Sequence, residues 1–157
     1  MSEPLLKVEN LVQHFPVSRT YTVKAVNGVS YSLDAGKVLG VVGESGSGKS
    51  VSAMSILRLL DGNGYIDSGE ILFNGVDLTK LSINEMYKIR GNEISVIFQE
   101  PMTSLNPVFT VSRQISEPLM IHQGMTKKQA AAKAVELLSD VKIPNPEVVA
   151  KQYPHQL

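Results

Sequence analysis

The chain has 157 residues, of which 43% are hydrophobic and 19% charged, and this predicts one globular domain with an apolar core. Fifteen basic and fifteen acidic residues give zero formal net charge, so we expect no nucleic acid partner and no anionic membrane surface. The lack of cysteine excludes a disulfide scaffold and Cys-ligated metals, and no apolar run approaches the roughly 18 to 20 residues of a membrane span.

Two stretches at the start of the chain predict strands. Residues 5–15 alternate imperfectly between apolar and polar, and residues 23–33 form a longer strand pattern that Asn27-Gly28 interrupts. Residues 16–20 and 34–37 have the composition of turns.

A phosphate-binding motif follows. Residues 38–42, Val-Leu-Gly-Val-Val, predict a strand buried on both faces. Residues 43–50 then read Gly-Glu-Ser-Gly-Ser-Gly-Lys-Ser and match the P-loop pattern G-x-x-x-x-G-K-[ST] at each fixed position. Its glycines allow backbone N–H groups to approach phosphate, while Lys49 is expected to contact the β- and γ-phosphates and the Ser50 hydroxyl to bind Mg²⁺. A helical pattern over residues 51–60 would direct its positive end at the same phosphates.

This strand, loop and helix arrangement disfavours the alternative of a flexible Gly/Ser-rich turn that binds nothing. The expected nucleotide-binding residues are Gly43, Glu44, Ser45, Gly46, Ser47, Gly48, Lys49, Ser50 and Val51. We interpret Glu44 as a variable loop position, because a carboxylate beside phosphates is poorly placed to act as a base. The two strands that precede the phosphate-binding strand suggest an added antiparallel sheet.

Residues 26–31, followed by Gly36-Lys37 and the P-loop, resemble the opening of an ATP-binding cassette (ABC) ATPase subunit. The resemblance implies ATP and Mg²⁺ as cofactors and an α/β P-loop NTPase core with an N-terminal antiparallel β subdomain. In that family an aromatic residue of the first sheet stacks on adenine. The register puts Phe15 in this role with Tyr21 as the runner-up, and the alternative is that Phe15 is an ordinary strand residue of the core.

The next stretch has the features of scaffold. Residues 68–78 resemble the return of the antiparallel sheet, and Asn74-Gly75 is a turn signal. Ser82 and Glu85 form a capping-box pattern that predicts a short helix over residues 81–90, closed by Gly91.

Residues 94–98 predict a second buried strand, which ends at Gln99. A glutamine alone in such a position is usually structural. However, residues 99–107 resemble the Q-loop of the ABC ATPase subunits of oligopeptide, dipeptide and nickel importers. The resemblance implies that Gln99 reaches Mg²⁺ and the attacking water, and that the following loop touches a membrane permease. Lys49 and Gln99 are therefore the expected catalytic residues, and Ser50 and Gln99 the expected metal ligands.

The rest of the chain predicts helices. Residues 111–120 share an apolar face that Pro118 is expected to kink or end, and a capping box at Thr126 opens a helix to about residue 141. They look like the start of the ABC helical subdomain. We expect one partial nucleotide-binding domain, with the antiparallel sheet and P-loop core in residues 1–100 and the Q-loop and helical subdomain in residues 101–157.

Residues 153–157, Tyr-Pro-His-Gln-Leu, resemble the stretch that leads into the ABC signature motif. On this basis we expect the first half of a family subunit, without the signature, the second acidic motif or the switch histidine, and inactive alone. The resemblance implies an importer ATPase for peptides or nickel on the cytoplasmic side of the membrane. Its partners would be a second ATPase subunit, identical or different, permease subunits and, indirectly, a substrate-binding protein. A non-hydrolysing nucleotide-binding module and a nonfunctional fragment remain alternatives, while residues 98–101 disfavour another P-loop kinase or GTPase.

Overall fold

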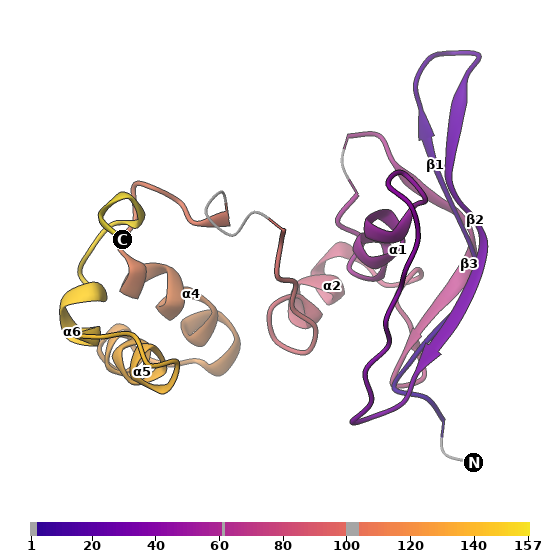
Figure 1. Cartoon of the computed structure of the whole chain (residues 1–157). Coiled ribbons are helices and arrows are strands. Elements are labelled where there is room, and N and C mark those ends of the chain that lie inside the picture. The colour runs from indigo at the N-terminus through magenta and orange to yellow at the C-terminus, as the bar shows by residue number, and fades with distance from the viewer. Residues whose placement is uncertain (1–2, 61, 100–103) are drawn as a thin grey trace. The chain divides into compact units, whose positions relative to one another are not determined.

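The computed structural model describes residues 3–60, 62–99 and 104–157 and divides into two compact units, Met1–Tyr87 and Lys88–Leu157. The first unit holds a β-sheet and the P-loop, and the second is largely helical (Figure 1). The domain boundary expected near residue 100 stays a prediction.

A four-stranded sheet organises the first unit. Its strands are β1 (Leu6–Pro16), β2 (Thr22–Leu33), β3 (Tyr65–Phe73) and β4 (Val76–Asp77), in the order β2-β1-β3-β4. All neighbouring pairs are antiparallel, which confirms the expected antiparallel sheet. Asn74 and Gly75 connect β3 to β4 with φ angles of 48° and 78°, as a two-residue hairpin turn requires.

Helix α1 (Lys49–Ile56) lies beside one face of this sheet (Figure 1). The apolar side chains buried in this unit come from the sheet, from the residues that directly follow α1 and β4, and from Met86: Val8, Leu11, Val26, Leu57, Ile71, Leu78 and Met86. Helix α2 (Ile83–Ile89) begins as the sequence indicates, since Glu85 Oε2 accepts from Ser82 N at 2.8 Å and Ser82 Oγ accepts from Glu85 N at 3.3 Å.

The second unit contains α4 (Val111–Gln123), α5 (Lys127–Asp140), the short α6 (Pro146–Val149) and the 3₁₀ turn η1 (Pro154–Gln156). The capping box at the start of α5 is confirmed: Thr126 N donates to Gln129 Oε1 at 3.0 Å and Gln129 N to Thr126 Oγ1 at 3.4 Å. Val111, Leu138 and Ala150 form a buried cluster that joins α4, α5 and the residue after α6.

Pro118 does not end α4, which continues to Gln123 and stops at Gly124 with a φ of 64°. Proline removes one backbone N–H donor, but the helical turns before and after Pro118 are each held by other interactions. Thr110 caps its start, and its buried residues Val111, Ser116 and Leu119 lie on both sides of the proline. Packing along the whole helix therefore outweighs the local cost.

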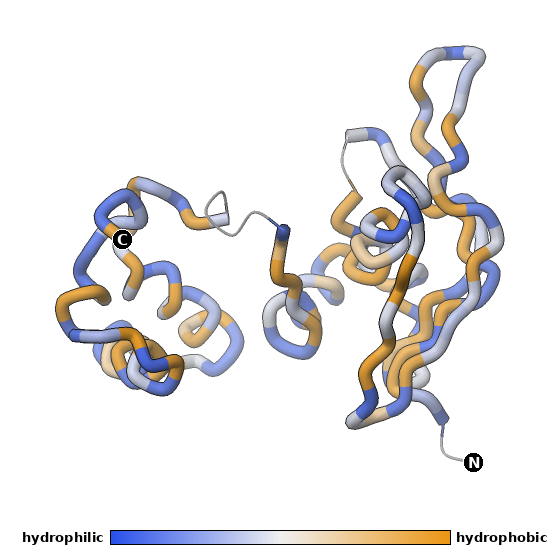
Figure 2. Tube along the Cα trace, in the orientation of Figure 1, coloured by the Kyte–Doolittle hydropathy of each residue, from blue (hydrophilic) through white to orange (hydrophobic). Residues whose placement is uncertain are grey.

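Residues 38–42 and 94–98, expected to be buried strands, are not strands in the structure, apart from a single bridge between Arg90 and Ile94. Their side chains are largely exposed, with Val38 at 97% and Ile97 at 95%. The apolar stretch that leads from β2 to α1 is visible in Figure 2. A strand requires a neighbour for its backbone hydrogen bonds, and no strand among the described residues pairs with either segment.

Candidate nucleotide-binding site

The P-loop is built at the N-terminus of α1. Residues 43–48 form the loop, and Lys49, Ser50 and Val51 make the first turn of the helix. A turn within the loop is closed by Ser47 N, which donates to Glu44 O at 3.2 Å. All nine residues expected to bind nucleotide therefore lie in one continuous loop and helix start.

Gly48 joins this loop to the sheet. Its φ is 86°, in the left-handed region, and a Cβ added to it would lie 2.3 Å from the carbonyl oxygen of Ala25 on β2. The Val26 side chain lies under the same point, with its Cγ2 at 3.6 Å from that Cβ position. Only glycine satisfies both the conformation and the close approach of the two backbones.

The Lys49 ammonium group lies against the loop. Lys49 Nζ donates to Gly43 O at 2.7 Å, to Glu44 O at 2.6 Å and to Ser47 Oγ at 3.2 Å. A positive charge is thus held against a loop of small residues. This is the charge that a phosphate group would meet.

The backbone of α1 adds hydrogen-bond donors. The N–H groups of Lys49, Ser50 and Val51 have no acceptor within the helix, and Gly48 supplies no side-chain cap. A helix N-terminus without a cap, next to a lysine and a glycine-rich turn, has the donor set that binds phosphate. Ser50 is exposed on this first turn and offers a hydroxyl oxygen to a cation.

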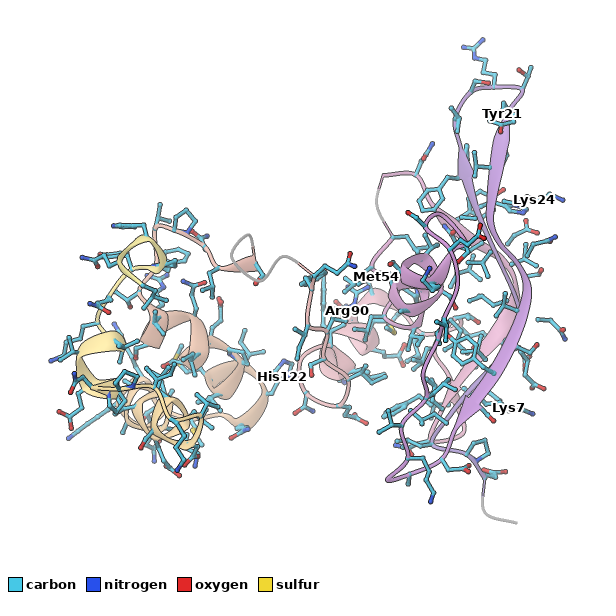
Figure 3. All side chains as sticks on the ribbon, viewed as in Figure 1. Lys7, Tyr21, Lys24, Met54, Arg90 and His122 are labelled. Atoms are coloured by element: carbon cyan, nitrogen blue, oxygen red, sulfur yellow. The ribbon has the colours of Figure 1, made fainter. Side chains whose placement is uncertain are left out.

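Phe15 lies near the loop in the register of the sheet. It pairs with Val23 on β2, two residues from Ala25, where Gly48 approaches the strand. Its half-buried ring packs on the backbone of Gly64, since a Cβ there would lie 2.4 Å from the ring. Tyr21 is at the far end of the β1–β2 hairpin and 61% exposed (Figure 3). The adenine contact of Phe15 stays a prediction.

Gln99 is exposed and belongs to the second unit. Its expected role at the metal stays a prediction. The next four residues of the expected Q-loop, 100–103, lie outside the described residues.

Gln114, on α4, is a residue that the sequence did not single out. Its Oε1 accepts from Asn106 N at 2.8 Å, and its Nε2 donates to Asn106 O at 3.0 Å and Phe109 O at 2.9 Å. One side chain thus fixes the described end of the expected Q-loop to the helix. A lone glutamine in a helical pattern carries no signal of such contacts, because they depend on how the loop folds back.

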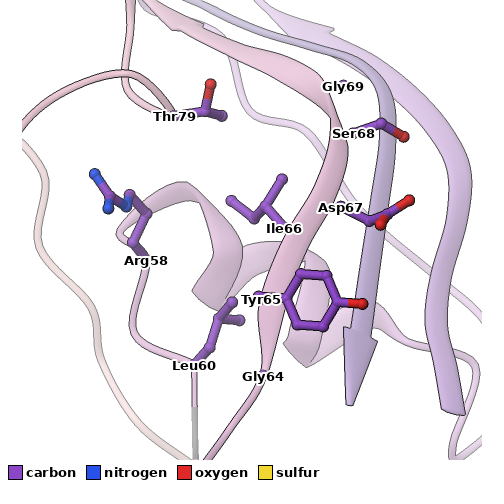
Figure 4. A pocket seen from close by; sticks show the side chains of 9 residues that line it. All are labelled: Arg58, Leu60, Gly64, Tyr65, Ile66, Asp67, Ser68, Gly69 and Thr79. Carbon is purple, nitrogen blue, oxygen red and sulfur yellow. The ribbon is translucent and has the colours of Figure 1, made fainter. Parts of the chain in front are cut away.

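A separate hollow of about 460 Å³ lies beside β3 (Figure 4). Ile66 points into it, with Arg58 and Thr79 on the opposite wall. The Arg58 side chain is hydrogen-bonded within the fold, since its Nη1 donates to Leu81 O at 2.5 Å. The described residues that line the hollow include none from the P-loop, so it is distinct from the phosphate site.

The sheet, loop and helix define a P-loop nucleotide-binding protein. A family model described as ABC transporter matches residues 26–157, and the chain belongs to this family. The chain is 47% identical over 161 residues to a putative peptide import ATP-binding protein of Brucella abortus, covering 99% of this chain and 47% of the relative. It is 49% identical over 155 residues to the oligopeptide transport ATP-binding protein OppD of Bacillus subtilis, covering 97% of this chain and 42% of the relative.

The fold agrees with the family. A bacterial ABC transporter cassette solved as a dimer has a TM-score of 0.80 at 24% identity, covering 97% of this chain and 62% of that chain. A second solved structure, of the same cassette in a post-hydrolysis state bound to ADP and Pi, has a TM-score of 0.78 at 23% identity, with the same coverage of both chains. The chain spans less than half the length of the curated relatives described above.

Proposed function

We propose that this chain binds Mg-ATP as part of the ATPase subunit of an ABC importer for di- or oligopeptides. The observation that carries the proposal is the P-loop itself, in which Lys49 Nζ lies against the loop next to the uncapped N–H groups of α1. The relatives support peptides as the cargo class, since they are named for peptide and oligopeptide import. No relative described above is named for nickel.

The chain's own residues account for phosphate binding. Loop and helix N–H groups donate to phosphate oxygens, and the Lys49 ammonium offsets their charge. Ser50 supplies one oxygen to Mg²⁺, which keeps most of its remaining ligands as water and phosphate oxygens. This fits the described residues, among which no cluster of three or more His, Cys, Asp or Glu side chains could hold a metal. The bound Mg²⁺ would neutralise charge on the β- and γ-phosphates.

The proposal extends to partners. Two cassettes would assemble and act on permease subunits at the cytoplasmic face of a membrane, with a substrate-binding protein as an indirect partner. Among the described residues no helix has the length and apolar character needed to span a bilayer. Phe15 would stack on adenine, and Gln99 would contact the metal and the attacking water.

Titration calorimetry with Mg-ATP tests the site. We expect weak but measurable binding by the chain and none by Lys49→Ala, because that variant removes the charge held over the loop. Lys37→Ala is the matched control, since Lys37 is an exposed lysine in the turn after β2. Equal affinity in the Lys49→Ala protein would overturn the assignment.

A further inference from the structure

A hydrogen bond between the sheet and α1 lies one turn beyond the P-loop. Tyr31, half-buried on β2, has its hydroxyl 3.0 Å from Ser52 Oγ. Ser52 is 7% exposed, and its backbone N–H donates to Gly48 O at 2.8 Å. A continuous path of bonds therefore runs from Tyr31 through Ser52 to the last glycine of the loop.

The same strand thus holds the start of α1 at two points. Ala25 and Val26 lie against Gly48, and Tyr31 is bonded to Ser52 four residues further along the helix. One contact with β2 would fix the position of the helix start, whereas two contacts also fix the direction of the helix axis. The direction of α1 determines where the N–H groups of its first turn point, and phosphate affinity depends on their orientation.

We propose that Tyr31 is a positioning residue for nucleotide binding, which orients the N-terminus of α1 through Ser52. The inference rests on the proposed binding of Mg-ATP and adds a residue outside the P-loop motif. Without the Tyr31 hydroxyl, the buried Ser52 Oγ loses this hydrogen-bond partner, and the second point at which β2 holds α1 is lost.

Three variants test the inference: Tyr31→Phe, Ser52→Ala and the double variant, each measured for the dissociation constants of Mg-ATP and of Mg-tripolyphosphate. Tyr31→Phe keeps the ring and removes only the hydroxyl. We expect each single variant to weaken both ligands about two- to tenfold, the size of one net hydrogen bond. Because both groups form one bond, the double variant should lose no more than about the larger single effect.

Tyr65→Phe is the matched control, since Tyr65 on β3 is 44% exposed and lines the hollow beside β3, whose described lining includes no P-loop residue. The melting temperature of each variant is also measured, in order to distinguish an effect on the orientation of α1 from an effect on stability. A purely structural role of Tyr31 would lower the melting temperature and leave both dissociation constants unchanged at a temperature where the protein is folded.

Two failures are distinguishable. If the unaltered chain does not bind Mg-ATP, or Lys49→Ala binds equally well, the proposed function is wrong. If the chain binds and Lys49→Ala does not, but Tyr31→Phe and Ser52→Ala bind like the unaltered chain, the role of Tyr31 is wrong while the site stands. Should Tyr31→Phe fail to fold, Ser52→Ala alone decides, because alanine is well tolerated in a helix.

Discussion

A methyl group on Gly48 would lie 2.3 Å from the carbonyl oxygen of Ala25, so the P-loop and β2 meet backbone to backbone. No side chain can be inserted at this point without moving the loop or the strand. Gly48 therefore serves two purposes. Its left-handed φ allows helix α1 to begin at the next residue, and its missing Cβ allows the backbone of the sheet to support the loop.

Gly48→Ala should destabilise the chain more than Gly46→Ala. Both glycines have left-handed φ angles, 86° and 79°, which cost an alanine about 1–2 kcal/mol. A Cβ at Gly46 meets no atom within 4 Å, whereas at Gly48 it meets backbone. We expect a lower melting temperature and at least a tenfold larger loss of Mg-ATP affinity for Gly48→Ala. Equal effects would show that the contact with Ala25 does not limit the fold.

The 157-residue chain should release no phosphate from ATP above the rate of Lys49→Ala. Phosphoryl transfer requires that the metal be held, the water oriented and the γ-phosphate charge offset together. Lys49 and Ser50 contribute to holding the metal and to offsetting the γ-phosphate charge, but neither side chain orients a water for attack. A phosphate-release assay checks this, and turnover near ~1 to 100 s⁻¹ that Lys49→Ala abolishes would contradict it.

The chain should bind a hydrophobic dye and aggregate, because residues 38–42 and 94–98 are apolar and exposed. Replacing Val38 and Ile97 together by threonine should reduce dye fluorescence and leave the melting temperature nearly unchanged, since neither side chain is buried. Val8→Thr is the contrast: Val8 is buried in the sheet, and a hydroxyl there should cost about 1–3 kcal/mol. If the double variant binds as much dye as the unaltered chain, these segments are not its source.

Acid should remove a stabilising contribution from Asp77, on β4. Burial raises the pKa of this carboxyl, but the ammonium group of Lys80 at 2.8 Å, together with hydrogen bonds from the Thr79 hydroxyl and backbone N–H, outweighs burial and holds the pKa below its ordinary value of 3.8. A lowered pKa in the folded state stabilises it above the unfolded value, and that stabilisation is lost as the pH falls through the folded value.

Asp77→Asn should therefore lower the free energy of unfolding at pH 7 by about 1 kcal/mol. Below about pH 4, the free energy of unfolding of this variant should fall less steeply with decreasing pH than that of the unaltered chain. Denaturant titrations from pH 2 to 7 measure both effects. Glu9→Gln is the control. Glu9 and its ion-pair partner Lys7 are both exposed, and exposed ion pairs contribute little to the free energy of unfolding. A pH profile of Asp77→Asn that matches the unaltered chain would contradict the assignment.

The local features of this fold follow from short stretches of sequence. The P-loop, the capping boxes at Ser82 and Thr126 and the turn at Asn74-Gly75 depend on residues a few positions apart, and the structure has each of them. The antiparallel sheet was also predictable, because the pattern of its strands and their turns is local.

Features that depend on distant neighbours arise only when the chain packs. Residues 38–42 and 94–98 have the composition of buried strands, but a strand forms only where another strand accepts its hydrogen bonds. The contact of Gly48 with Ala25 and the bond between Tyr31 and Ser52 each join positions about twenty residues apart. No periodicity encodes such pairs, because they arise only when α1 packs on the sheet.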